Sequence, residues 1–258
     1  MAAINRDPLL QVQEITVTFE GFKALDRVSL SVSAASVQVL IGPNGAGKST
    51  LMDAIIGRVH PVSGRIVFKG EDIMRLPEYL VVRRGICRKF QTPGILPTLS
   101  VEDNIVVAVK RSRGWTRTLR RSISAVEQQR VDEILELVML VDKRHLLAGH
   151  LAHGAKQWLE IGMVVASDGD LLLLDEPAAG MTHQERAKTA ELIKSLAQRH
   201  AFIVVDHDMD FVTQLQAPVS VLHMGRMLRQ GSIDEVRNDP QVQAVYLGRA
   251  EEGKNAQA

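Results

Sequence analysis

The stretch that decides the fold of this chain reads Gly42-Pro43-Asn44-Gly45-Ala46-Gly47-Lys48-Ser49. It fits the pattern G-x-x-x-x-G-K-[ST], whose glycines let the backbone wrap closely around phosphate groups. The apolar run at residues 37–41 predicts a strand before this stretch, and residues 48 to about 56 predict a helix after it, which Gly57 caps. Because strand, loop and helix follow in the order that the motif requires, the sequence predicts a phosphate-binding loop.

Each part of this loop has a task in binding a nucleoside triphosphate. Successive backbone N–H groups point at phosphate oxygens, and the helix presents its positive N-terminal end to the same anion. Lys48 is expected to reach the β- and γ-phosphates, and Ser49 is expected to ligate Mg²⁺. The predicted nucleotide contacts within the loop and helix are Gly42, Pro43, Asn44, Gly45, Ala46, Gly47, Lys48, Ser49 and Thr50. The alternative is a glycine-rich turn that binds nothing, and the strand and helix around the motif count against it.

A second motif predicts the catalytic carboxylates. Residues 171–174 are four leucines, and Asp175 and Glu176 follow them. A buried strand that ends in two carboxylates delivers them to the carboxyl edge of the sheet, where ligands bind. We expect Asp175 to hold Mg²⁺ through its water shell and Glu176 to act as general base on the attacking water. A buried strand before an ordinary acidic surface turn is the alternative, which the phosphate loop disfavours.

The rest of the chain predicts one α/β domain over residues 1–258. Apolar runs at residues 171–174 and 202–205 are typical of parallel strands covered on both faces, whereas alternating residues between 10 and 32 predict an antiparallel layer. Helix-period patterns dominate residues from about 98 to 168, which predicts an inserted helical subdomain. We therefore expect a P-loop NTPase (RecA-like) fold, with a parallel-sheet core, an antiparallel β layer and a helical insertion.

Composition argues against several classes of function. Aromatic residues make up 4% of the chain and the formal net charge is +1, so neither a stacking surface nor an electrostatic footprint for nucleic acid is predicted. Cys87 is the only cysteine in the sequence, so no intrachain disulfide can form. No stretch approaches about 18 consecutive apolar residues, and we expect any role in transport to require docking onto a separate membrane protein.

Further segments resemble, in order and spacing, the nucleotide-binding subunits of ABC transporters over essentially the whole chain. Phe19 stands where this family places an aromatic that stacks on adenine, although by itself it would be an ordinary core residue. Gln91, in Arg88-Lys89-Phe90-Gln91, matches the glutamine loop that touches Mg²⁺ and relays to the membrane subunit. His207 matches the switch histidine at the γ-phosphate, although alone it would be a structural histidine at a strand end.

The resemblance thereby implies a complete set of cofactors and roles. ATP and Mg²⁺ are the expected cofactors. The metal ligands are expected to be Ser49, Gln91 and Asp175, and the catalytic residues Glu176, His207 and Gln91.

The family signature Leu-Ser-Gly-Gly-Gln is altered in this chain. It is expected just before a helix that begins near residue 156, where the residues are Leu151, Ala152, His153, Gly154 and Ala155. The alanines at 152 and 155 cannot form the hydrogen bonds of the serine and the glutamine. Residues 179–182 match the loop that contacts the partner in the family's dimer. Because the family sandwiches ATP between two subunits, the resemblance implies that residues 151–155 contact the partner's ATP.

The resemblance extends to one branch of importers. Residues 156–163, 176–182 and 245–249 look like the importers for hydrophobic amino acids and amides. Within that branch His153, Met181 and residues 205–209 are most similar to the ATPase subunit of the urea importer, with the branched-chain amino acid importer as the runner-up.

This branch implies several partners and a location. They are a second ATPase subunit, expected to be a different chain, transmembrane permease subunits, and a solute-binding protein that acts indirectly. The expected location is the cytoplasmic face of the inner (plasma) membrane, as a peripheral subunit. No nucleic-acid partner is expected.

Two other functions stay open. A non-transport ABC ATPase acting on DNA or ribosomes generally carries long coiled coils or two ATPase domains, and a chain of 258 residues has room for neither. A binding module that closes on ATP but hydrolyses little is compatible with the altered signature, although Lys48, Glu176 and His207 count against it. A basic cluster is interpreted as a solvated helical face, with contact to anionic lipid headgroups as the alternative, and no function is assigned to it. Its residues are Lys110, Arg111, Arg113, Arg117, Arg120 and Arg121.

We expect Lys48→Ala to abolish detectable binding of Mg-ATP, because the loop then loses the cation that faces the β- and γ-phosphates. Calorimetric titration of the wild type and the variant measures this, with a lysine outside every motif changed to alanine as the control. Wild-type affinity in Lys48→Ala would place the nucleotide site elsewhere.

Overall fold

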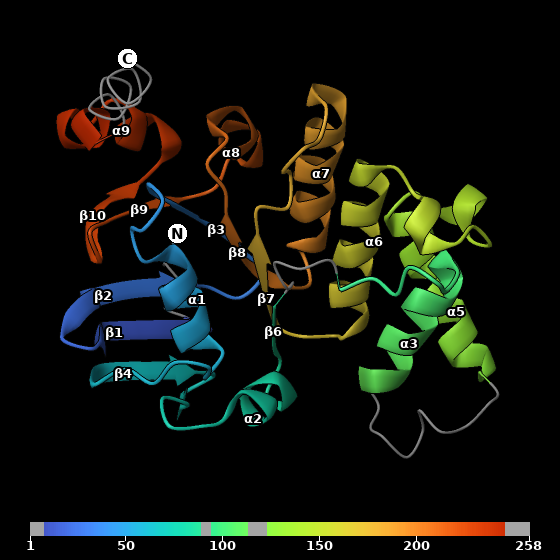
Figure 1. The fold of residues 1–258 in the computed structure, drawn as a ribbon, viewed down its shortest axis with the longest axis horizontal. Coiled ribbons are helices and arrows are strands. Elements are labelled where there is room, and N and C mark those ends of the chain that lie inside the picture. Colours follow the sequence, from blue (N-terminus) through green and yellow to red (C-terminus); the bar gives the residue numbers. More distant parts are fainter. Residues whose placement is uncertain (1–7, 89–93, 113–122, 246–258) are drawn as a thin grey trace, which may run out of the picture.

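A computed structural model describes residues 8–88, 94–112 and 123–245 of the chain (Figure 1). A mixed sheet with helices and a separate antiparallel sheet make up this part. The α/β class predicted from the sequence is confirmed.

Six strands form the central sheet, in the order β10-β9-β3-β8-β7-β6. Their bounds are β3 Val37–Ile41, β6 Ile86–Arg88, β7 Leu171–Asp175, β8 Ala201–Val205, β9 Val219–His223 and β10 Arg226–Gly231. All neighbouring pairs are parallel except β9 with β10. The carboxyl ends of five strands therefore meet at one edge of the sheet.

The central strands are buried on both faces because a different layer covers each face. On β7, Leu172 and Leu174 belong to one hydrophobic core, whereas Leu171 and Leu173 belong to the other. The first core is completed by helices that follow residue 100, and the second by α1 and the antiparallel sheet. Cover on both sides explains why the sequence of these strands is apolar without alternation.

The antiparallel sheet has the strand order β2-β1-β4-β5. Its strands are β1 Leu10–Phe19, β2 Phe22–Val32, β4 Ser63–Phe68 and β5 Glu71–Asp72. Glu20 and Gly21 both have positive φ angles, +48° and +87°, as a tight hairpin turn requires. The alternation between residues 10 and 32 predicted β1 and β2, but β4 and β5 were missed because their apolar positions are few.

Some helices cover the central sheet, and others form a separate group at one end of the molecule (Figure 1). Their bounds are α1 Lys48–Ile55, α2 Glu78–Arg83, α3 Val101–Ser112, α5 Ala125–Leu137, α6 His153–Ala166, α7 His183–Leu196, α8 Met209–Leu215 and α9 Ile233–Arg237. α3, α5 and α6 pack together around Gly162, where a Cβ atom would lie 3.1 Å from side-chain atoms of Ile105 and Val138. We propose that these helices belong to a subdomain at residues 98–168 within a single domain comprising residues 1–258.

The described ranges contain no helix that is long and apolar enough to cross a membrane. Cys87 on β6 is a buried thiol. Lys110 on α3 is only 9% exposed, so the prediction of a solvated basic face is wrong for this residue. The helix there turns Lys110 toward the packed side, which a charge count does not reveal.

Candidate functional site

The phosphate loop follows β3 and is held in shape by neighbouring segments. The Gly225 N–H donates a hydrogen bond to the Ala46 carbonyl over 2.9 Å. A Cβ atom at Gly42 would lie 2.2 Å from a carbonyl oxygen of β9, and one at Gly47 would lie 2.7 Å from the Ala24 carbonyl oxygen. With φ angles of +153° and +104°, both positions favour glycine on conformational grounds as well. The fold itself therefore sets the curvature of the loop.

The N-terminal end of α1 offers donors to an anion. Gly47 is the N-cap residue and supplies no side-chain hydrogen bond to the helix. The first backbone N–H groups of a helix lack intrahelical partners. The Lys48 ammonium donates to the Gly42 and Pro43 carbonyls over 2.7 Å and 3.0 Å, so it lies against the loop. A wrapped backbone, a helix N-terminus and a cation at one point fit the phosphate chain of ATP.

Asp175 ends β7 as a buried carboxylate, with 5% of its side chain exposed. Arg88 on β6 places its Nη2 3.2 Å from Asp175 Oδ2 and its Nη1 2.6 Å from Asp53 Oδ1 on α1. This buried guanidinium therefore offsets part of the negative charge of the two carboxylates. Asp175 Oδ2 and the exposed hydroxyl of Ser49 are the oxygen ligands that Mg²⁺ prefers, so the donor types fit this ion.

Sequence reasoning missed the role of Arg88, which it quoted only as part of the glutamine-loop segment. The contact with Asp175 depends on the pairing of β6 with β7, where Arg88 lies opposite Leu173. A strand of three residues gives too short a pattern to predict that pairing.

Glu176 follows Asp175 with a φ angle of +46°, an uncommon conformation for a residue with a side chain. Its N–H donates to the Val205 carbonyl over 2.8 Å, so the pairing of β7 with β8 holds its position. Its Oε1 lies 3.2 Å from Nδ1 of His207, and both side chains are about half exposed or more, at 47% and 66%. The sheet edge thus brings together two residues that the sequence assigned to catalysis.

Asp206 supports this pair and was missed by sequence reasoning. Its Oδ1 accepts hydrogen bonds from the N–H groups of His207 and Asp208, over 2.8 Å and 3.0 Å. Its Oδ2 is buried without a hydrogen-bond partner in the described ranges. Burial raises the pKa of the Asp206 carboxyl above its usual value. An aspartate that bonds to the next two N–H groups is a recognisable local turn, so Val205-Asp206-His207-Asp208 carried a signal for it.

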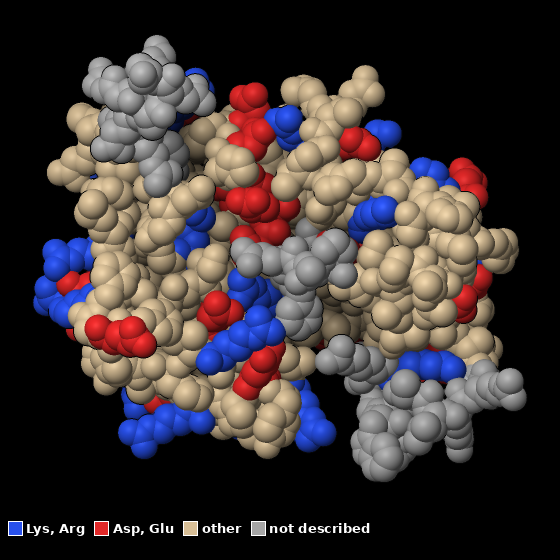
Figure 2. Space-filling view, in the orientation of Figure 1, with Lys and Arg blue, Asp and Glu red and all other residues tan. Residues whose placement is uncertain are grey.

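Acidic side chains gather over α8 and the neighbouring ends of β7 and β8 on the face shown in Figure 2. Glu176 and Asp210 are exposed in this part of the chain, and Asp208 is partly exposed. Negative charge at the strand ends and positive charge at the phosphate loop give the site two poles, which suits a metal-bound nucleotide.

The predicted signature segment lies at the start of α6. Ala152 is the N-cap residue of this helix, and no side chain caps it. Leu151 and Ala155 are buried, with 5% and 3% exposed. His153 points instead to another loop, with Nε2 2.9 Å from the Ala179 carbonyl oxygen. Because residue 155 is buried, a glutamine there would need space that the packed core does not offer.

Phe19 and Gln91 are two further residues of the predicted site. Phe19 ends β1 with 47% of its surface exposed, so it is a surface residue and not an ordinary core residue. Its predicted contact with adenine stays a prediction. Gln91, predicted to touch Mg²⁺, lies outside the described residues.

The phosphate loop and the signature segment lie in different parts of the chain. In Figure 1, α1 lies beside the antiparallel sheet, whereas α6 lies with α3 and α5 beyond β7. One chain therefore does not bring the two segments together. The predicted contact of residues 151–155 with the nucleotide of a partner is compatible with this separation and stays a prediction.

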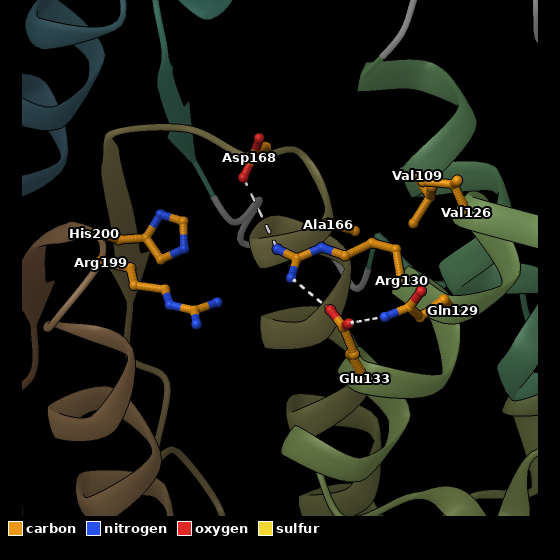
Figure 3. Close-up of a pocket in the computed structure, with 9 residues that line it drawn as sticks. All are labelled: Val109, Val126, Gln129, Arg130, Glu133, Ala166, Asp168, Arg199 and His200. Carbon is orange, nitrogen blue, oxygen red and sulfur yellow. Dashed lines mark hydrogen bonds and ion pairs between the residues drawn. The ribbon is translucent and has the colours of Figure 1, made fainter.

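A cavity of about 440 Å³ lies elsewhere, between α5, the end of α6 and the residues before β8 (Figure 3). Arg130 reaches Glu133 and Asp168 there, at 3.4 Å and 3.9 Å, and Arg199 points toward the same space. Two arginines and two carboxylates leave no net charge to select an ionic ligand. None of its lining residues belongs to the predicted nucleotide site.

Comparison with known families gives matches in two parts of the chain. Residues 25–179 match the family model described as ABC transporter. Residues 230–252 match the model described as branched-chain amino acid ATP-binding cassette transporter.

Curated relatives and solved structures agree with these matches. The chain is 32% identical to the high-affinity branched-chain amino acid transport ATP-binding protein BraF of Pseudomonas aeruginosa, over 94% of this chain and 99% of that protein. The same figures hold for the protein LivG of Escherichia coli K12, which has the same description. The ADP conformation of MJ1267, an ATP-binding cassette of an ABC transporter, superposes with a TM-score of 0.81 at 29% identity, covering 93% of this chain and 99% of that one.

We expect Glu176→Gln to keep ATP binding and to lower hydrolysis by about 10²–10⁴-fold, because the amide keeps the shape of the side chain but accepts no proton. Nucleotide binding and phosphate release by the assembled complex measure the two effects. Glu136→Gln, at an exposed position on α5, is the matched control. Undiminished phosphate release by Glu176→Gln would assign the general base to another group.

We expect Ala152→Ser to raise ATP hydrolysis by the assembled complex, because its hydroxyl adds a hydrogen bond to the partner's γ-phosphate. Serine at this N-cap position also stabilises α6, by about 0.5–2 kcal/mol. Ala152→Asp separates the two effects, since aspartate caps the helix but repels phosphate. The unfolding temperature of the isolated chain should rise in both variants, whereas the rate of ATP hydrolysis by the complex should rise only in Ala152→Ser. Equal hydrolysis in the serine variant and the wild type would show that this side chain is not limiting.

Proposed function

The chain belongs to the ABC transporter family and is the ATPase subunit of such a transporter, and we propose that the transporter imports branched-chain amino acids. The observation that carries the choice of solute is the similarity to BraF and LivG along nearly the whole of those proteins, 99% of each. The match of residues 230–252 to the branched-chain amino acid model adds a second region that supports it.

In this proposal the phosphate loop and the acidic strand ends bind different parts of Mg-ATP. The backbone N–H groups of residues 44–49 and the Lys48 ammonium bind the phosphates of ATP. Ser49 and Asp175 hold Mg²⁺ with Gln91, and the ion, when bound, neutralises charge on the β- and γ-phosphates. Asp175, whose Oδ2 lies 3.2 Å from Arg88 Nη2, would hold the ion directly or through its water shell.

In this proposal the exposed side chains of Glu176 and His207, beside Asp175, serve proton transfer. Glu176 accepts the proton of the attacking water as general base. His207, with Nδ1 3.2 Å from Glu176 Oε1, orients that carboxylate and reaches the γ-phosphate. Asp206 fixes the backbone of His207 through the hydrogen bond from its N–H. Phe19 offers its exposed ring to adenine.

The proposed assembly contains further subunits. A second ATPase subunit, which we expect to be a different chain, places its nucleotide against residues 151–155. Transmembrane permease subunits dock near the glutamine loop, and a solute-binding protein delivers the solute to them. The chain acts at the cytoplasmic face of the plasma membrane as a peripheral subunit. Low hydrolytic activity, as the altered signature allows, is the alternative within this assembly.

Urea was the solute expected from the resemblance at His153, Met181 and residues 205–209. The curated relatives named above are described as branched-chain amino acid transport proteins, and they do not support urea. The residues that bind the solute belong to other subunits in this proposal. The choice therefore requires a transport measurement.

Deleting this subunit in its host is expected to abolish ATP-dependent uptake of leucine and to leave urea uptake unchanged. Uptake of both labelled solutes measures this, with complementation by the wild type and by Glu176→Gln, which should fail to restore uptake. Lost urea uptake with normal leucine uptake would contradict the proposal and favour the urea importer.

A further inference from the structure

The side chain of His153 joins two segments that the proposed function places at the subunit interface. Its Nε2 lies 2.9 Å from the Ala179 carbonyl oxygen, in the loop that follows Glu176. Since a carbonyl only accepts, Nε2 carries the hydrogen and donates it. This contact links the signature segment directly to the loop at residues 178–181.

The loop backbone is shaped around the imidazole ring. Gly180 has a φ angle of +69°, and a Cβ atom there would lie 2.8 Å from Nε2 of His153 and 2.9 Å from its Cδ2. Only glycine leaves room for the ring at this distance, because real Cβ atoms do not approach so closely. The hydrogen bond is thus accompanied by close packing of ring and backbone.

The first turns of α6 and α7 meet beside this contact. The Glu185 carboxylate accepts hydrogen bonds from the N–H and the hydroxyl of Thr182, each over 2.9 Å. The hydrogen bonds from Thr182 hold the pKa of Glu185 below its usual range, and His153 adds to this by its charge. A Cβ atom at Gly154 would lie 2.4 Å from Glu185 Oε1, so α6 packs directly against this carboxylate.

The far end of the loop is tied to the switch histidine segment. The Arg186 Nε donates to the Met181 carbonyl over 3.1 Å, and its Nη1 forms an ion pair with Asp208. Asp208 follows His207 directly. The loop at residues 178–181 therefore has one attachment to the signature segment and another to the catalytic edge of the same chain.

We propose that His153 is a positioning residue that fixes the loop at residues 178–181 relative to residues 152–155, so that both segments meet the partner subunit's nucleotide as one unit. The role in the assembly rests on the proposed function. This positioning role suits a signature whose Ala152 and Ala155 have no hydrogen-bonding side chain to set the relative position of the two segments. His153 supplies the missing polar contact within the chain itself.

The first test uses the isolated full-length chain and needs no transport activity. Hydrogen exchange at the amides of Ala179 and Met181, which donate to Glu176 and Ala178, is measured by mass spectrometry. His153→Ala should speed exchange there by about two- to tenfold, the range expected for one lost hydrogen bond. His153→Gln, whose amide can donate from nearly the same point, should restore the wild-type rate. His150→Ala, at a neighbouring exposed histidine, is the matched control. Unchanged exchange in His153→Ala would overturn the link.

The second test uses the assembled complex. His153→Ala should raise the KM for ATP by about two- to tenfold while kcat changes little, because the chain's own base and phosphate loop are intact. His153→Gln should restore the KM. A wild-type KM in His153→Ala, with faster exchange in the first test, would overturn the positioning role. A wild-type complex without ATP hydrolysis would overturn the proposed function, while the exchange result would still decide whether the link exists.

Discussion

The register of the parallel strands β7, β8 and β3 is the constraint on which the rest of the structure depends. These strands are buried on both faces and are apolar along their length except for Gln38 of β3, and the charged groups of the site stand where the strands end. Val205 lies opposite both Asp175 and Leu40, which aligns the three ends at one edge. A slip by one residue would exchange the faces of each strand and move Asp175 away from that edge. Core packing thereby positions the catalytic groups.

Charge at this edge is balanced only in part by the chain itself. Arg88 pairs with both Asp175 and Asp53, so its single positive charge offsets only part of their negative charge, and Asp53 also lies 3.8 Å from Arg58. Removing one partner of a buried pair typically costs about 3–5 kcal/mol. No lysine or arginine in the described part of the chain pairs with Asp206, and burial of its carboxyl raises its pKa above the usual value. The phosphate loop, which follows the neighbouring strand β3, has the opposite character, with Lys48 and a helix N-terminus. A ligand with a metal ion and phosphates is attracted at both ends of the site. The acidic strand ends attract the metal ion and the phosphate loop attracts the phosphates, which orients the ligand.

The sequence was informative where a motif is local. Residues 42–49 predicted a strand, a loop and a helix because each glycine and the lysine act within a few residues of one another. Glu176 was assigned from its place after a strand and His207 from the family resemblance, and the pairing of β7 with β8 brought them together. Arg88 and His153 were assigned no such roles because their partners, Asp175 and Ala179, are distant in sequence. Such contacts depend on strand order and helix packing, which periodicity does not give.

The altered signature bears most strongly on the symmetry of the proposed assembly. Without a hydroxyl at Ala152, the signature loses a hydrogen bond to a charged group, worth about 1.5–3 kcal/mol. The N-terminal end of α6 still presents uncapped backbone N–H groups, so attraction for an anion remains. Since these groups serve the nucleotide bound by the partner, the weakness lies at the partner's site. A partner with an intact signature leaves this chain's own Glu176 and Lys48 fully supported, and the two sites become unequal. A partner identical to this chain weakens both sites equally, so the identity of the second subunit decides whether hydrolysis alternates or is confined to one site.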